Sequence, residues 1–89
     1  MNKTIYLGTT KNCAACYHQE TLLTELINER PDITLKVCDY SELPQWLQVN
    51  VLLTDFPVTI LVEDEVIKYY FVGTKTTRKM LNLFNDICF

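Results

Sequence analysis

The residues of this chain best suited to chemistry are two cysteines at C-x-x-C spacing, Cys13 and Cys16, with two alanines between them. A strand-like apolar run at residues 4–7 precedes the pair, and a helix-like segment follows it. Two thiols at this spacing can close a small disulfide, and unpaired backbone N–H groups at the start of a helix stabilise a thiolate on the first sulfur. The position of the pair therefore favours thiol redox chemistry over a structural crosslink.

A C-x-x-C pair is also half of a structural zinc site, which is the main chemical alternative. Such a site needs two more ligands, and the sequence has no second C-x-x-C. His18 lies about 200° around an ideal helix from Cys16, so it is poorly placed to bind the same metal as both sulfurs. Cys38 is a candidate third ligand, because its strand is expected to end at the same edge of the sheet, but a fourth ligand is missing. We predict no metal and no cofactor.

The elements that position the pair follow from hydrophobic periodicity and turn signals. The pattern predicts a strand at residues 3–7, a helix from 13 to about 29, a strand at 33–38 and a short helix from 41 to about 49. A two-stranded hairpin at 58–62 and 66–72 follows, and then a last helix from 76 or 77 to about 87. A whole helix lies between the first two strands in the sequence, so these strands are expected to be parallel, with a right-handed crossover. The order βαβαββα predicts an α/β fold.

The two cysteines are expected to differ in exposure. On an ideal helix, Cys16 shares the buried stripe with Leu23, Leu26 and Ile27, whereas Cys13 lies at the exposed end. Other apolar side chains are assigned to the core as well: Trp46, Met80, Leu81, Phe84 and Ile87, with Cys38 and Cys88 as small apolar residues.

The composition indicates one small packed domain, residues 1–89, because 48% of the residues are hydrophobic and only two glycines and three prolines occur. No 18-residue apolar stretch could span a bilayer and no signal-peptide pattern precedes the first strand, so we expect a cytoplasmic protein without a membrane partner. The net charge is −3 and no Lys/Arg cluster combines with aromatic residues, which argues against a nucleic-acid partner.

The order of these elements resembles that of thioredoxin-fold oxidoreductases of the short kind typified by glutaredoxins. The resemblance rests on the strand, the C-x-x-C at a helix start, the parallel strand, Phe56-Pro57 before a hairpin, Gly73 and the final helix. It covers nearly the whole chain. It implies a thioredoxin-like α/β fold of glutaredoxin size, with a four-stranded mixed sheet flanked by helices.

The same resemblance implies roles for single residues. Cys13 corresponds to the nucleophile, Cys16 to the resolving cysteine and Pro57 to a cis-proline beside them. Pro57 and its neighbours Phe56 and Val58 are then candidates for substrate contact, with Phe56 pairing an extended peptide through its backbone. Two charged residues are expected to adjust the pKa of Cys13 in opposite directions, and these are Lys11 and Asp55.

We therefore predict a monomeric dithiol–disulfide oxidoreductase of the electron-carrier type, which reduces disulfides in protein substrates. Its electron donor is a flavoprotein reductase or glutathione, and the sequence leaves that choice open. Two alternatives also stay open. One is a non-catalytic thioredoxin-like module that docks a partner on its Phe56-Pro57 surface, and the other is a zinc or iron–sulfur protein that binds metal through Cys13 and Cys16.

Overall fold

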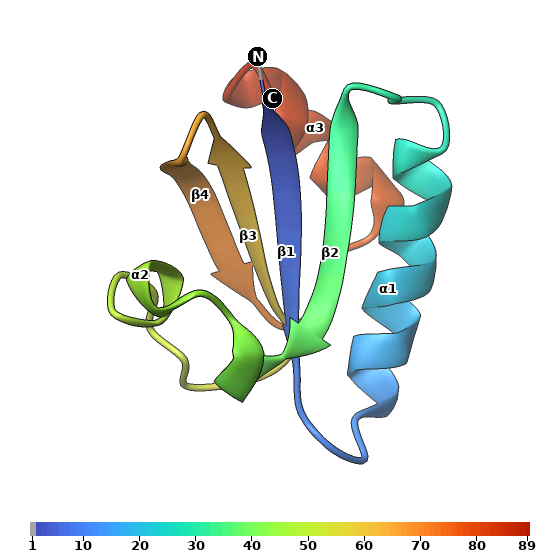
Figure 1. Ribbon diagram of the computed structural model, residues 1–89. Coiled ribbons are helices and arrows are strands. Elements are labelled where there is room, and N and C mark those ends of the chain that lie inside the picture. The colour runs from blue at the N-terminus through green and yellow to red at the C-terminus, as the bar shows by residue number, and fades with distance from the viewer. Residues whose placement is uncertain (1) are drawn as a thin grey trace.

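One mixed sheet of four strands organises residues 2–89, which a computed structural model describes (Figure 1). The strand order is β2-β1-β3-β4. β1 pairs in parallel with β2 and antiparallel with β3, and β3 pairs antiparallel with β4. The strands are β1 at Lys3–Thr9, β2 at Ile33–Asp39, β3 at Val58–Glu63 and β4 at Val66–Val72. The predicted order of elements and the parallel pairing of the first two strands are confirmed.

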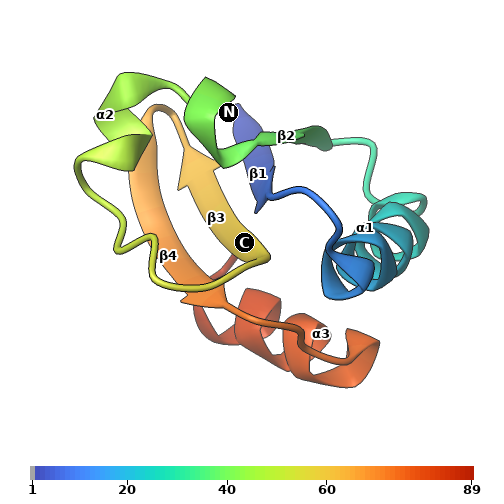
Figure 2. The same cartoon turned by 90° about the horizontal axis from the view of Figure 1, so that it is seen from below.

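Helices cover both faces of this sheet (Figure 2). They are α1 at Ala14–Ile27, the 3-10 helix η1 at Tyr40–Glu42, α2 at Gln45–Gln48 and α3 at Thr77–Asp86. α1 and α3 pack on one face, where Leu23 and Met80 are fully buried with Ile5 and Leu61. The segment with η1 and α2 covers the other face. Within the described part of the chain, no helix is long and apolar enough to cross a membrane.

The predicted short helix at residues 41–49 is divided in two, which corrects the expectation from sequence. η1 comes first, with Asp39 rather than Ser41 as its N-cap, and α2 begins only after Pro44. The reason is local, because a proline disfavours helical backbone in the residue before it, and Leu43 is extended at φ −60° and ψ 144°. Leu43 remains buried, but Trp46 is 37% exposed and is not a core residue.

Two more expectations near the end of the chain are corrected. Met80 and Phe84 are buried as predicted, whereas Leu81 is 48% exposed because it lies beside their stripe on α3. Cys88 lies just beyond the helix, and its side chain is exposed instead of packing in the core as predicted. The first strand also extends two residues beyond its predicted end, so that Gly8 pairs with both Cys38 and Val58.

Candidate active site

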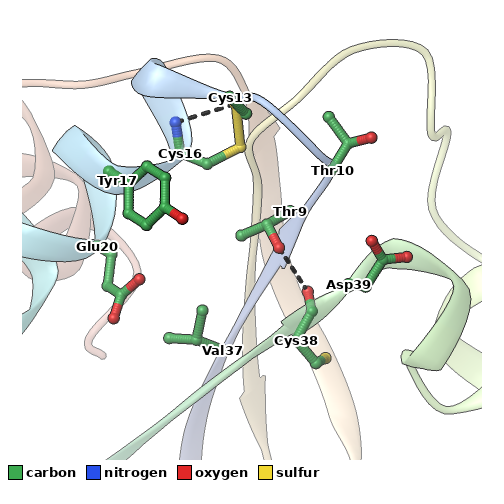
Figure 3. Close-up of a pocket in the computed structure, with 9 residues that line it drawn as sticks. All are labelled: Thr9, Thr10, Cys13, Cys16, Tyr17, Glu20, Val37, Cys38 and Asp39. Atoms are coloured by element: carbon green, nitrogen blue, oxygen red, sulfur yellow. Dashed lines mark hydrogen bonds between the residues drawn. A yellow bond between two sulfur atoms is a disulfide. The ribbon is translucent and has the colours of Figure 1, made fainter.

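α1 begins directly after Cys13, and this boundary determines the geometry of the cysteine pair. Cys13 is the N-cap residue, with extended backbone at φ −114°, and its Sγ accepts a hydrogen bond from the backbone N–H of Cys16 at 3.1 Å. The two Cα atoms lie 5.2 Å apart and the sulfurs form a disulfide (Figure 3). A helix N-terminus carries partial positive charge and unpaired N–H groups, which favour a thiolate on the capping sulfur once the disulfide is reduced.

The two sulfurs lie in different environments. Cys16 is 4% exposed and faces the core, as the helical periodicity predicts, whereas Cys13 is partly exposed. An incoming thiol or disulfide therefore reaches Cys13 more easily than Cys16. This difference in access is what a pair needs if one cysteine is to react with a substrate and the other with its neighbour.

Pro57 lies at the same edge of the sheet as the disulfide. Gly8 pairs with Val58, so Pro57 precedes β3 where β1 leads into the loop before Cys13. The Phe56–Pro57 peptide bond is cis, as the resemblance implies. The carbonyl oxygen of Pro57 accepts a hydrogen bond from the backbone N–H of Gly73 at 2.7 Å, which joins this loop to the end of β4.

Burial divides the three predicted substrate-contact residues. Pro57 and Val58 are fully buried, and Val58 packs in the core beneath α2. Its side chain is therefore not available to a substrate, and its predicted contact would be made through the backbone. Phe56 is partly exposed, and its ring lies 5.0 Å from the ring of Tyr40. Phe56 is the member of this group that a substrate can touch through its side chain.

The two predicted electrostatic modulators are both exposed and lie on different loops. Lys11 lies between β1 and α1, two residues before Cys13. Asp55 accepts a hydrogen bond from the backbone N–H of Phe56 at 2.8 Å. Their influence on Cys13 stays a prediction.

A pocket of about 300 Å³ opens beside the disulfide, between the start of α1 and the ends of β1 and β2 (Figure 3). We call it the disulfide pocket, and it is lined by Thr9, Thr10, Cys13, Cys16, Tyr17, Glu20, Val37, Cys38 and Asp39. Three of these residues were not predicted from the sequence as parts of the site, namely Tyr17, Glu20 and Asp39. The helical repeat could have indicated two of them, because residues four apart share a helix face. Tyr17 lies four residues after Cys13, and Glu20 lies four residues after Cys16.

Asp39 combines a structural and an electrostatic role at the rim of this pocket. Its Oδ1 accepts hydrogen bonds from the backbone N–H and the hydroxyl of Ser41, at 3.0 and 2.7 Å. These two bonds hold the pKa of Asp39 below its usual value, and the positive charge of Lys11 lowers it further. Asp39 is therefore a carboxylate at neutral pH.

The third cysteine does not join the pair. Cys38 packs with the residues beneath α2, and in Figure 3 its sulfur points away from the disulfide. Partial burial raises the pKa of the Cys38 thiol, and the charges of Glu42 and Asp39 raise it further. His18 is exposed on α1. Across residues 2–89, no group of three or more His, Cys, Asp or Glu side chains is arranged to hold a metal ion.

The sheet order, its helical cover and the position of the cysteine pair together define the thioredoxin fold, and solved structures match it. Desulfothioredoxin from Desulfovibrio vulgaris Hildenborough, in its reduced form, has a TM-score of 0.83 at 16% sequence identity, over 97% of this chain and 82% of its own. Oxidised mitochondrial thioredoxin 3 from Saccharomyces cerevisiae has a TM-score of 0.76 at 22% identity, over 96% and 78%. Oxidised thioredoxin O2 from Arabidopsis thaliana has a TM-score of 0.73 at 20% identity, over 96% and 74%.

These matches establish the fold of the protein and confirm the resemblance inferred from its sequence. No protein-family model matches the sequence, and no curated protein matches it.

Proposed function

We propose that the protein is a dithiol–disulfide oxidoreductase that reduces disulfide bonds in protein substrates. The observation that carries the proposal is the disulfide between a partly exposed N-cap cysteine, Cys13, and a buried neighbour, Cys16, at the start of α1. A structural disulfide needs no difference in access between its two sulfurs, whereas sequential thiol exchange does.

In the proposed cycle the Cys13 thiolate of the reduced protein attacks one sulfur of a substrate disulfide. The substrate S–S bond breaks, a mixed disulfide with Cys13 forms, and the other substrate sulfur leaves as a thiolate that takes up a proton. Cys16 then loses its proton and attacks the Cys13 sulfur. The second substrate thiol is released, and the Cys13–Cys16 disulfide retains the oxidation that the substrate has lost. A thiol-based donor, either a flavoprotein reductase or glutathione, returns the two electrons.

The hydrogen bond from the Cys16 N–H to the Cys13 sulfur contributes to the first step, where it stabilises the attacking Cys13 thiolate. Because the hydrogen-bond donor is the backbone N–H of Cys16, within the same helical turn as Cys13, it is in position before the substrate arrives.

The test combines a redox titration with serine variants. In defined thiol/disulfide buffers we expect reversible formation of the Cys13–Cys16 disulfide at a potential between about −180 and −270 mV. Reduction of a protein disulfide such as that of insulin should be lost in Cys13→Ser. Cys16→Ser should instead accumulate a mixed disulfide on Cys13, which mass spectrometry detects. Cys88 supplies the matched control, because it is an exposed free cysteine outside the disulfide pocket, and Cys88→Ser should keep the wild-type rate.

The alternatives predict different results. A non-catalytic docking module would bind its partner equally well after Cys13→Ser and would show no turnover in the unmodified protein. A metal protein would hold its metal through Cys13 and Cys16 and would protect both thiols from alkylation. Either result would overturn the oxidoreductase proposal.

A further inference from the structure

The disulfide pocket is joined to the reacting sulfurs, because Cys13 and Cys16 form part of its wall. A peptide whose cysteine reacts at Cys13 can therefore place a neighbouring side chain at the mouth of this pocket. The chemistry of the other lining residues therefore bears on which peptides react well.

The charged side chains that line the pocket are both acidic. Glu20 projects from α1 and Asp39 lies at the end of β2, on the opposite side of the opening (Figure 3). Among the described lining residues none is Lys, Arg or His. Asp39 is ionised at neutral pH, since its hydrogen bonds from Ser41 hold its pKa low. A cation inside the pocket would be attracted by both carboxylates and an anion would be repelled by both, with the nearby charge of Lys11 offsetting part of the Asp39 contribution.

The remaining walls suit the stem of a long cationic side chain. Val37 forms the floor in Figure 3, and the ring of Tyr17 reaches into the opening from α1. Lysine and arginine bury their methylene groups against apolar surface while the charged end meets polar partners. The face of a tyrosine ring also attracts cations.

The distances fit a basic residue close to the reacting cysteine. Glu20 is seven residues beyond Cys13, which is about 10 Å along the helix axis. A neighbouring residue in the substrate adds a Cα step of about 3.8 Å, and a lysine or arginine stem carries the charge farther in the same direction.

We propose that the disulfide pocket binds the side chain of a lysine or arginine adjacent to the reacting cysteine, so that the protein prefers basic disulfide peptides to acidic ones. This inference rests on the proposed oxidoreductase function and specifies its substrate class. Glu20 and Asp39 are the residues that determine the preference.

The test uses three peptides, acetyl-Cys-Xaa-amide with Xaa as Lys, Gln or Glu, each joined by a disulfide to thionitrobenzoate. The Cys13 thiolate attacks the peptide sulfur, the mixed disulfide forms, and the coloured thionitrobenzoate anion leaves because it is the better leaving group. The rate of colour release by the reduced protein gives a second-order rate constant for each peptide. The leaving group is identical throughout, so differences report the neighbouring side chain.

We expect the rate constants to fall in the order Lys, Gln, Glu, with about a two- to fivefold change at each step, the size expected for partly exposed charge pairs. In Glu20→Gln the Lys-to-Glu ratio should fall toward one. Glu29→Gln is the matched control, because it makes the same change in net charge at an exposed position beyond the other end of α1. It should keep the wild-type ratio. Asp39 is left unchanged because it caps η1.

The outcomes separate this inference from the function on which it rests. Equal rates for the three peptides, or an unchanged ratio in Glu20→Gln, would overturn the pocket assignment while leaving the oxidoreductase function intact. Failure of all three peptides to react faster with the reduced protein than with Cys13→Ser would overturn the proposed function and this inference with it.

Discussion

Gly8 of β1 packs against Val58 of β3 and Leu43 of the segment before α2, and replacing it with alanine is a direct test of this packing. An added Cβ would lie 2.6 Å from Cγ1 of Val58 and 3.1 Å from Cδ1 of Leu43. Carbon atoms in contact normally lie about 3.5–4.0 Å apart, so the first distance is too short by about 1 Å. Both neighbours are buried, which leaves little room for either side chain to move.

We expect Gly8→Ala to lower the free energy of unfolding by about 1–3 kcal/mol, the range measured when a well-packed core receives an extra carbon. In a domain of this size, 2 kcal/mol corresponds to a fall in the melting temperature of roughly 8–16 °C. Urea denaturation followed by circular dichroism measures the first quantity, and a thermal scan measures the second. The change is small enough that the variant should still fold.

A double-mutant cycle identifies which contact causes the loss of stability in Gly8→Ala. Val58→Ala removes the Cγ1 atom, so the penalty of Gly8→Ala should shrink markedly in that background. Gly73→Ala is a useful contrast, since Gly73 has a φ of +83° but no atom within 4 Å of an added Cβ. The loss of stability in Gly73→Ala comes from the positive φ, which an alanine rarely adopts, and should not depend on Val58. A neutral Gly8→Ala variant, or costs that add without coupling to Val58, would refute the close-approach argument.

Three further predictions concern other contacts. Gln19 is fully buried, and its Oε1 accepts a hydrogen bond from the backbone N–H of Lys75 at 2.7 Å. Gln19→Leu should therefore lower the free energy of unfolding, measured by urea denaturation, by about 1–3 kcal/mol. An unchanged stability would contradict the stabilising role of this hydrogen bond. Arg30 donates hydrogen bonds to Asp32 and lowers the pKa of Asp32 from 3.8 to about 2. The folded-state pKa is the lower one, so this pair stabilises the fold above pH 3.8 and the contribution is lost as the pH falls toward 2. Asp32→Asn should therefore be less stable than the unmodified protein at pH 7, and the difference in unfolding free energy should shrink as the pH falls below 3.8 and be mostly lost at about pH 2. A difference as large at pH 2 as at pH 7 would contradict the assignment. Thr76 caps α3, and Thr76→Ala should cost about 1 kcal/mol in thermal unfolding while the redox potential stays constant.

The order and adjacency of the elements follow from the sequence because each depends on local signals. Pro31 lies just beyond the end of α1, apolar runs mark the strands, and Thr76 caps α3. The C-x-x-C position then places Cys13 at an N-cap with no further information. These features need only a few neighbouring residues each, which is why the fold and the cysteine pair were both predicted correctly.

The surroundings of the pair were harder to predict because they combine residues from separate elements. The disulfide pocket forms only when the start of α1 meets the end of β2, and it brings Glu20 together with Asp39 across 19 positions of sequence. The buried position of Val58 likewise depends on cover from the segment around α2, whose helix was predicted as one piece. Local signals do not determine such tertiary contacts.

The position of Cys38 was partly predictable, and it bears directly on the chemistry. In β2 the apolar residues Ile33, Leu35 and Val37 alternate with Thr34, Lys36 and Cys38, and side chains along a strand point to opposite faces in turn. Ile33 and Leu35 pack in the core beneath α1 and α3, and Cys38 packs beneath α2. The strand therefore ends at the edge expected from its parallel pairing with β1, but its thiol faces away from Cys13 and Cys16. A metal site with Cys38 as third ligand would require this strand to turn over, whereas disulfide exchange requires only the two cysteines already joined at the start of α1.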